Sequence, residues 1–376
     1  DISAYADIDV EVYASLAPFQ WPQRICETGE EKRFFAEGGY FTKDRRARFV
    51  SIPYRPAVDQ PERYYPFVLN TGRIRDQWHT MTRTAKVPRL LSHISEPFVE
   101  MHADDAQALR LKSGMIAEVS SSIGRVLARV VVSDEQQRGV IFMPMHWNDQ
   151  FARYARVGAL IASHTDPVSG QPELKFTPVK VDRFAAAWYG FTVTQEKPHI
   201  DQFEYAVIAP TQSGVRMEFA DRGDPASWRE LAEQVLAIHH IGGVELLAYE
   251  DARRGDYRFA AFQKNRCVGL FFASRDPVSV SRSWAVDQLG DVVAPEQRLR
   301  LLAGRAGNGI ADRGPIVCSC FDVGANEIVG AVKSGRCRSA ADIGATLKAG
   351  TNCGSCRTEV MRIVAAVGAA TSLVDA

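Results

Sequence analysis

Four cysteines near the C-terminus constrain the fold of this chain more than any other feature of its sequence. They follow the pattern C-x-C, then thirty-two residues, then C-x-x-C, and they are Cys318, Cys320, Cys353 and Cys356. Each pair adjoins a segment with apolar residues at helical spacing, such as NEIVGAVKSG, SAADIGATLKAG and RTEVMRIVAAV. We therefore expect two loops to converge at one end of a small helical domain and to present four thiolates to one site.

Four thiolates suit either a Zn²⁺ ion or an iron–sulfur cluster, because both favour a soft tetrahedral set of sulfur ligands. A structural zinc site usually has C-x-x-C on both sides, and disulfides are not expected in a reducing compartment. The spacing favours an iron–sulfur cluster and leaves zinc open. Cys267 lies apart, in an apolar hairpin pattern, and is expected to be a small core residue.

The composition excludes several classes of partner. Lysine and arginine together number 45, as do aspartate and glutamate, so no charge excess favours nucleic acid or an anionic membrane. The sequence has no apolar run of eighteen residues and no signal-peptide pattern at its start. We expect a cytoplasmic protein. The missing initiator methionine suggests a piece of a longer chain.

Changes of pattern divide the first half of the chain into two regions. Residues 1–60 carry turn signals and a proline-rich stretch that reads as an extended linker after the end of an upstream domain. Residues 61–183 contain short β-branched runs, typical of a compact barrel or sandwich. Within them, acids followed by a basic residue and a glycine predict a helix over 102–114.

The second half also divides in two. Residues 184–312 mix strand patterns with a helix opened by the capping box Ser227–Glu230, and a hairpin is expected to turn at Lys264 and Asn265. This α+β connecting module has no chemical motif, and its role is not evident from the sequence. Residues 313–376 form the helical, cysteine-bearing region.

The segment NTGRIRDQWHTMTR, residues 70–83, is the second informative stretch. An apolar strand leads into a loop that carries Arg73, Arg75, Trp78 and His79. A guanidinium suits a phosphate, and indole and imidazole rings suit stacking or hydrogen bonding. The residues indicate a site for an anionic ring compound, although an ordinary turn with solvated arginines has the same composition.

Residues 317–364 resemble the [2Fe–2S] domain of the bacterioferritin-associated ferredoxin type. That family has C-x-C, about thirty residues and C-x-x-C, with AGTNCGSC at the second pair, as this chain has. The resemblance implies that Cys318, Cys320, Cys353 and Cys356 ligate a [2Fe–2S] cluster. Cys337 falls outside the pattern and is expected to be a spectator.

Residues 65–181 resemble the C-terminal dinucleotide-binding domain of molybdopterin oxidoreductases, in the assimilatory nitrate reductase branch. The match rests on NTGRIRDQWHTMTR, FMPMHWNDQ and DPVSGQPELKFTPVKV, which occur in the family's order. In the family, this domain is a six-stranded barrel that closes over two molybdopterin guanine dinucleotides. The implied cofactor contacts are Asn70, Thr71, Gly72, Arg73, Gln77, Trp78, His79, Thr80, His146, Trp147 and Lys175. Many relatives have Asn where this chain has Gly158, so an amide contact is absent there.

Together, the resemblances imply the C-terminal portion of the catalytic subunit of an assimilatory nitrate reductase. In that family, a flavoprotein, an NADH reductase subunit or a ferredoxin donates electrons to the [2Fe–2S] cluster. The electrons then pass through an upstream [4Fe–4S] cluster to molybdenum bound by two pterins, where nitrate becomes nitrite. No C-x-x-C-x-x-x-C occurs near residue 1, and the molybdenum-ligating cysteine of the family lies upstream. We therefore expect no catalytic residue here and no nitrate reduction by this chain alone.

The expected fold is a multidomain α+β protein with a six-stranded barrel, an α+β connecting module and a small helical [2Fe–2S] domain. Two other classes of function remain open. The chain could belong to another molybdopterin oxidoreductase, such as a formate dehydrogenase relative, which shares the barrel. It could instead be a non-catalytic module for electron transfer, or a zinc-stapled scaffold that docks a reductase.

Overall fold

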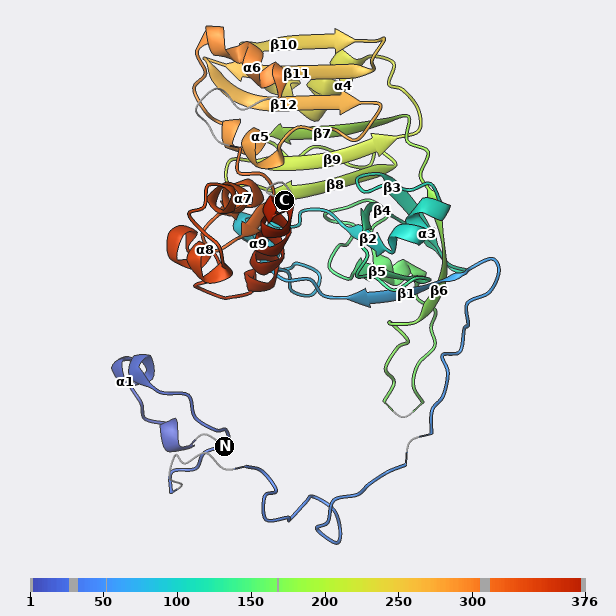
Figure 1. The fold of residues 1–376 in the computed structure, drawn as a ribbon, viewed down its shortest axis with the longest axis vertical. Helices are drawn as coiled ribbons and strands as arrows, with labels where there is room; N and C mark the ends of the chain where they lie inside the picture. The colour runs from blue at the N-terminus through green and yellow to red at the C-terminus, as the bar shows by residue number, and fades with distance from the viewer. Residues whose placement is uncertain (1–2, 27–32, 52, 168, 305–311, 373–376) are drawn as a thin grey trace. The chain divides into compact units, whose positions relative to one another are not determined.

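The computed structural model describes residues 3–26, 33–51, 53–167, 169–304 and 312–372. Their contacts define two compact units, Asp1–Pro56 and Ala57–Ala376. The first unit contains the 3-10 helix η1 (Ser3–Tyr5) and the helix α1 (Val10–Ser15), which begins where the Asp9 side chain accepts the Val12 N–H. The second unit contains a barrel, an open sheet and a helical domain, described in turn (Figure 1).

The barrel is a closed sheet in the order β1-β5-β2-β4-β3-β6. Its strands are β1 (Phe67–Gly72), β2 (Phe98–Met101), β3 (Ile116–Ser120), β4 (Arg125–Val132), β5 (Val140–Pro144) and β6 (Thr177–Arg183). The pairs β1–β5 and β2–β4 are parallel, and the other neighbours are antiparallel. Inward-facing residues such as Leu69, Val119 and Ile141 fill the interior and are fully buried. The predicted six-stranded barrel is confirmed.

Short helical segments connect the barrel strands. They are η2 (Thr84–Lys86), α2 (Pro88–Leu91), α3 (Ala103–Ala108) and η3 (Val157–Leu160). The prediction of a helix over 102–114 was wrong at its C-terminal end. Arg110 takes a left-handed backbone with φ of 55°, and the Leu111 N–H bonds to the Ala106 carbonyl at 2.8 Å, which ends the helix. Leu111 then packs into the barrel core, so tertiary burial overrides the local helical pattern.

The open sheet has six antiparallel strands in the order β10-β11-β12-β7-β9-β8. They are β7 (Trp188–Thr194), β8 (Tyr205–Pro210), β9 (Val215–Asp221), β10 (Val244–Asp251), β11 (Asp256–Gln263) and β12 (Arg266–Ser274). The predicted hairpin turns at Lys264 and Asn265, which both have positive φ as a tight hairpin turn requires. The central strand β7 is buried along its whole length, so both faces of the sheet are covered.

Different helices cover the two faces of this sheet. The helix α4 (Trp228–Val235) packs with Trp188, Phe219 and Phe271 on one face, and Ser227 caps it as predicted. The helices α5 (Arg282–Gln288) and α6 (Arg298–Ala303) pack with Phe191, Phe272 and buried Cys267 on the other. Two 3-10 segments complete this part, η4 (Ile238–His240) and η5 (Pro295–Gln297). Cys267 is a core residue, as expected.

The C-terminal domain contains a two-stranded ribbon and three helices. They are β13 (Ile316–Cys318), β14 (Val323–Gly324), α7 (Ala325–Lys333), α8 (Ala340–Leu347) and α9 (Arg357–Ser372). Ile328, Ile343 and Val360 meet in its core together with the Cys318 and Cys356 side chains. The helical domain is as predicted, with the short ribbon in addition. Within the residues that the structure describes, no helix is both long and apolar enough to cross a membrane.

Candidate cofactor sites

The two cysteine loops meet in the C-terminal domain. Cys318 ends β13 and Cys320 lies in the turn that follows, while Cys353 and Cys356 lie in the loop before α9. The Cys320 and Cys353 Sγ atoms are 3.3 Å apart. The Cys356 thiol also has a hydrogen bond with Cys318. The fold therefore brings the four predicted ligands together as two pairs, each with one thiol from either loop.

The two pairs differ in their surroundings. Cys318 and Cys356 are buried, whereas Cys353 is exposed and Cys320 is partly exposed. Burial, together with the hydrogen bond and charge of Cys318, raises the pKa of Cys356 to about 11. Hydrogen bonds from Ser355 and Cys320 lower the pKa of Cys353. One pair faces the interior of the domain and the other faces solvent.

The paired arrangement of the four thiols fits a two-iron cluster. In the described ranges of the chain, no three His, Cys, Asp or Glu side chains are placed to hold one metal ion. A tetrahedral zinc site needs four ligands around a single point. A [2Fe–2S] cluster needs only two protein ligands at each iron, which two separate thiol pairs supply.

Cys337 does not join the pairs. Its side chain is buried in the same domain and its Sγ lies 3.4 Å from the Thr346 hydroxyl. This packing provides a structural role for the thiol. Its place as a spectator remains a prediction.

The loop after β1 gathers the exposed side chains of the second candidate site. The Arg73 guanidinium lies 4.6 Å from the centre of the Trp78 ring, and the Trp78 and His79 rings meet edge to face at 4.5 Å. All three side chains are exposed. In the part of the chain that the structure describes, no carboxylate pairs with Arg73. This cluster offers a free positive charge beside aromatic faces, which fits a phosphate and a ring of a dinucleotide.

Buried His146 fixes the backbone of that loop. Its Nδ1 lies 2.6 Å from the His79 carbonyl oxygen, and its Nε2 accepts the Ile74 N–H at 3.0 Å. Since the carbonyl only accepts and the amide only donates, a neutral ring with its proton on Nδ1 satisfies both bonds. Burial lowers the pKa of His146, which favours this neutral form. His146 thus spans the loop that carries Arg73 and Trp78.

Replacing His146 with alanine should destabilise the protein by about 1–3 kcal/mol, because two partly buried backbone groups lose their hydrogen-bond partner and the buried ring leaves a cavity. Amide exchange at Ile74 should become faster, which mass spectrometry would detect. In the wild type, stability should also fall as pH drops below about 6.5, because the folded ring resists protonation more than the unfolded one.

The matched control is His164→Ala. In the wild type, the His164 ring lies 3.0 Å from the Asp59 carboxylate, but both side chains are more than a third exposed. We expect it to cost less than about 1 kcal/mol. Equal losses from the two variants would contradict the role given to His146.

The other predicted contacts divide into anchored and exposed groups. The Thr71 hydroxyl donates to the Leu174 carbonyl at 2.5 Å, and the Lys175 ammonium bonds to the Thr71 carbonyl. These bonds join the β1 end to the 164–177 loop. Gly72 is packed so closely that a Cβ would lie 2.7 Å from the Phe142 ring.

Gln77 and Trp147 are enclosed by protein. The Gln77 amide donates to the Leu90 carbonyl and accepts from the Thr84 hydroxyl. Trp147 is buried in the core between barrel and sheet, where its indole N–H has no partner among the described residues. Asn70 and Thr80 are exposed, and so is Gly158 in η3. For all these residues, contact with a cofactor stays a prediction.

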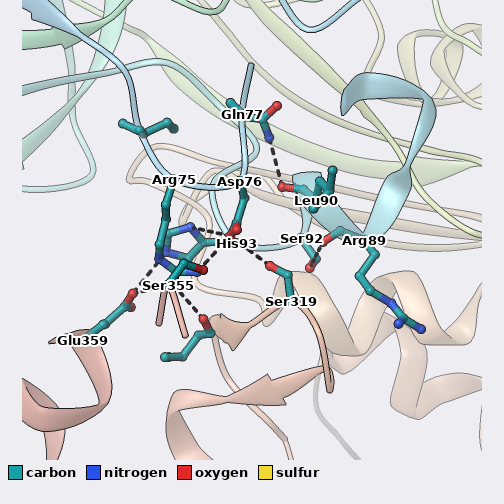
Figure 2. Close-up of polar contacts among 12 residues, drawn as sticks. Arg75, Asp76, Gln77, Arg89, Leu90, Ser92, His93, Ser319, Ser355 and Glu359 are labelled. Atoms are coloured by element: carbon teal, nitrogen blue, oxygen red, sulfur yellow. Dashed lines mark hydrogen bonds and ion pairs between the residues drawn. The ribbon is translucent and has the colours of Figure 1, made fainter. Parts of the chain in front are cut away.

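One further cluster of polar side chains could not be predicted from the sequence. Arg75, Asp76 and His93 from the barrel side contact Ser319 and Glu359 of the C-terminal domain (Figure 2). In the sequence, Arg75 is one of several arginines in the loop after β1, and nothing distinguishes it from Arg73. The partners are separated by more than 240 residues in sequence, so no local pattern reveals them.

Two known domain families match the regions that contain the candidate sites. Residues 67–178 match the molybdopterin dinucleotide binding domain, and residues 316–366 match the BFD-like [2Fe–2S] binding domain. The chain contains these two cofactor-binding domains. The resemblance to each of these two domains is thereby confirmed, and the second match favours an iron–sulfur cluster over zinc.

Curated relatives share these domains within longer proteins. The chain is 36% identical, over 97% of its length, to a nitrate reductase of Klebsiella oxytoca, and it spans 41% of that protein. It is 26% identical to a nitrate reductase of Shewanella frigidimarina, covering 86% of the chain and 35% of the relative. An F420-dependent formate dehydrogenase subunit alpha of Methanocaldococcus jannaschii is 33% identical over 43% of the chain, or 23% of that protein.

Proposed function

We propose that this chain is part of a molybdenum-dependent assimilatory nitrate reductase, which converts nitrate to nitrite. The observation that carries the proposal is the 36% identity that extends over 97% of the chain, connecting module included. The likeness to a formate dehydrogenase subunit covers only 43% of the chain. A domain shared across many enzymes would leave the rest of the chain unmatched, so the coverage favours nitrate.

In this proposal, the barrel holds bis-molybdopterin guanine dinucleotide at the loop after β1. Arg73 binds a phosphate, and Trp78 and His79 contact a ring, while His146 keeps their loop in place. Lys175 adds a second positive charge near Thr71. When bound, the molybdenum group supplies the oxygen transfer by which nitrate, two electrons and two protons become nitrite and water.

The second role in the proposal is delivery of electrons. Cys318, Cys320, Cys353 and Cys356 ligate the [2Fe–2S] cluster, with the exposed Cys320–Cys353 side open to a donor. The donor is a flavoprotein, an NADH reductase subunit or a ferredoxin, in the cytoplasm. A [4Fe–4S] cluster and the molybdenum ligand belong to the part of the protein outside this chain.

The proposal predicts that Arg73→Gln and Trp78→Ala, made together in the protein that contains this chain, lower pterin content at least about tenfold. The reason is the loss of a charge-assisted phosphate contact and a stacking surface, together worth about 2–4 kcal/mol. Nitrite formation with a reduced viologen dye should fall in proportion. Pterin is measured by fluorescence after oxidation, and iron by colorimetric assay.

Iron content serves as the internal control, because the four cysteines are untouched. Arg156→Gln is a matched surface control, since the ion pair of Arg156 with Asp149 is exposed and long at 3.9 Å. Normal pterin content in the double variant would show that the loop after β1 does not bind the dinucleotide. If the wild type contained its full complement of pterin but formed no nitrite, nitrate would not be the substrate.

A further inference from the structure

A polar cluster joins the barrel to the cysteine-bearing domain. One terminal nitrogen of Arg75 donates to the Val317 carbonyl at 2.7 Å and to a Glu359 carboxylate oxygen at 2.6 Å. The other donates to Asp76 at 2.8 Å. Arg75 therefore binds three acceptors with one planar group, and two of them belong to the opposite domain.

Asp76 and His93 complete the cluster. The Ser319 hydroxyl donates to Asp76 Oδ2 at 3.0 Å. The His93 ring lies between the two carboxylates, with Nδ1 3.4 Å from Asp76 and Nε2 3.3 Å from Glu359. Figure 2 shows these side chains pointing toward one another from the two domains. The Arg75, Asp76 and His93 side chains are at most 19% exposed, so solvent screens these charges only in part.

The contacts fall on the residues next to the proposed cluster ligands. Val317 precedes Cys318, and Ser319 separates Cys318 from Cys320. Arg89 adds a bond from its guanidinium to the Cys320 carbonyl at 3.3 Å. Glu359 lies in the first turn of α9, which follows Cys356 directly. The barrel side thus contacts the first cysteine loop directly and the second through the first turn of α9.

The same barrel loop carries the candidate dinucleotide contacts. Arg75 and Asp76 stand between Arg73 and Trp78, and His146 fixes this stretch through Ile74 and His79. A shift of the cysteine loops would pull on the backbone that presents Arg73 and Trp78. One short loop therefore contacts both candidate cofactor sites.

We infer that Arg75 is a positioning residue that fixes the [2Fe–2S] domain on the dinucleotide-binding loop and tunes the reduction of the cluster. This inference rests on the proposed function, since it requires a cluster at the four cysteines. The positive charge of Arg75, which contacts the residue before Cys318, favours the added electron on the cluster. Removing Arg75 leaves the negative charges of Asp76 and Glu359 without the Arg75 guanidinium that offsets them, which disfavours reduction.

Two substitutions at Arg75 separate charge from geometry. Arg75→Leu removes both the charge and the hydrogen bonds. Arg75→Lys keeps the charge, but a single ammonium cannot reproduce the planar fork. Glu359→Gln changes a residue of the other domain and removes a negative charge. It should therefore change the equilibrium constant for reduction of the cluster in the opposite direction from Arg75→Leu. A merely structural role would not produce opposite signs.

The control is another ion pair between the same two domains. Arg362 of α9 pairs with Glu135 of the barrel at 2.7 Å, but both side chains are more than 60% exposed. Neither residue lies in the loops that carry the cysteines or the dinucleotide contacts. Arg362→Leu therefore removes an interdomain ion pair of similar length without touching the proposed site.

The experiment is a redox titration of the [2Fe–2S] EPR signal in the protein that contains this chain. Arg75→Leu should lower the equilibrium constant for reduction about tenfold, as expected for one partly screened charge, and should shift the g values. Arg75→Lys should restore the constant, Glu359→Gln should raise it, and Arg362→Leu should leave it unchanged.

Two outcomes overturn the inference. Arg75→Leu with wild-type g values and a wild-type potential would show that Arg75 does not act on the cluster. If the Arg75→Leu protein loses the cluster, the test rests on Glu359→Gln. A cluster potential in Glu359→Gln that is unchanged or lower than in the wild type contradicts the inference. Absence of a [2Fe–2S] signal in the wild type is a different failure, which removes the proposed function as well.

Discussion

Replacing Cys353 with serine should abolish the [2Fe–2S] cluster, lowering iron and acid-labile sulfide from about two each per chain to near zero. The Cys353 Sγ lies 3.3 Å from the Cys320 Sγ, and no other thiol is in contact with it among the described residues. An iron that loses one of its two thiolates keeps an incomplete ligand set, and a serine hydroxyl is a much weaker ligand for it. Iron and sulfide assays on anaerobically purified protein measure the loss, and the rhombic EPR signal after reduction should vanish.

Cys337→Ser is the matched control in the same domain. The serine hydroxyl would replace the contact of the thiol with Thr346 and leave the four predicted ligands intact. We expect wild-type iron content from it. If Cys337→Ser lost the cluster while Cys353→Ser kept it, the assignment of ligands would be wrong.

Replacing Glu218 with glutamine should destabilise the protein by about 3–5 kcal/mol, the usual result of breaking a buried ion pair. Glu218 lies on β9 and is almost fully buried. Arg282 donates a hydrogen bond to each of its two carboxylate oxygens, at 2.7 and 2.9 Å. Arg129 of the barrel and Arg216 also reach it, at 3.4 and 3.3 Å. A neutral amide leaves these buried guanidinium groups without their shared anion. Thermal or denaturant unfolding measures the change.

The same cluster predicts a dependence of stability on pH. Burial alone would raise the pKa of Glu218, but Arg282 and its neighbours lower it to about 2. The unfolded carboxyl titrates near its ordinary value of 4.5. The folded state therefore binds fewer protons, so this stabilisation is complete above about pH 4.5 and is lost as pH falls toward 2. In Glu218→Gln, the free energy of unfolding should depend less on pH between about 4.5 and 2.

Asp224→Asn is the control for Glu218. Asp224 pairs with Arg275 at 2.5 Å, but both side chains are more than 40% exposed. We expect it to cost less than about 1 kcal/mol. Equal destabilisation by the two variants would contradict the importance given to burial at Glu218.

The sequence was sufficient for features that depend on neighbours along the chain. The capped helix at Ser227, the hairpin at Lys264 and the cysteine loops all follow from local pattern and spacing. The helix expected over 102–114 failed because Leu111 is drawn into the barrel core, which local propensity does not register. Long-range pairs also escaped prediction. Arg75 and Glu359 are 284 residues apart, and so nothing in either segment indicates the other.

The most direct test of the account is nitrate-dependent oxidation of the cluster in the protein that contains this chain. The protein is reduced, freed of excess reductant under anaerobic conditions and mixed with nitrate, while the [2Fe–2S] EPR signal and nitrite are followed together. The account predicts that the signal disappears and that one nitrite forms for every two electrons released. A signal that persists with nitrate, in protein shown to hold both pterin and cluster, would contradict it.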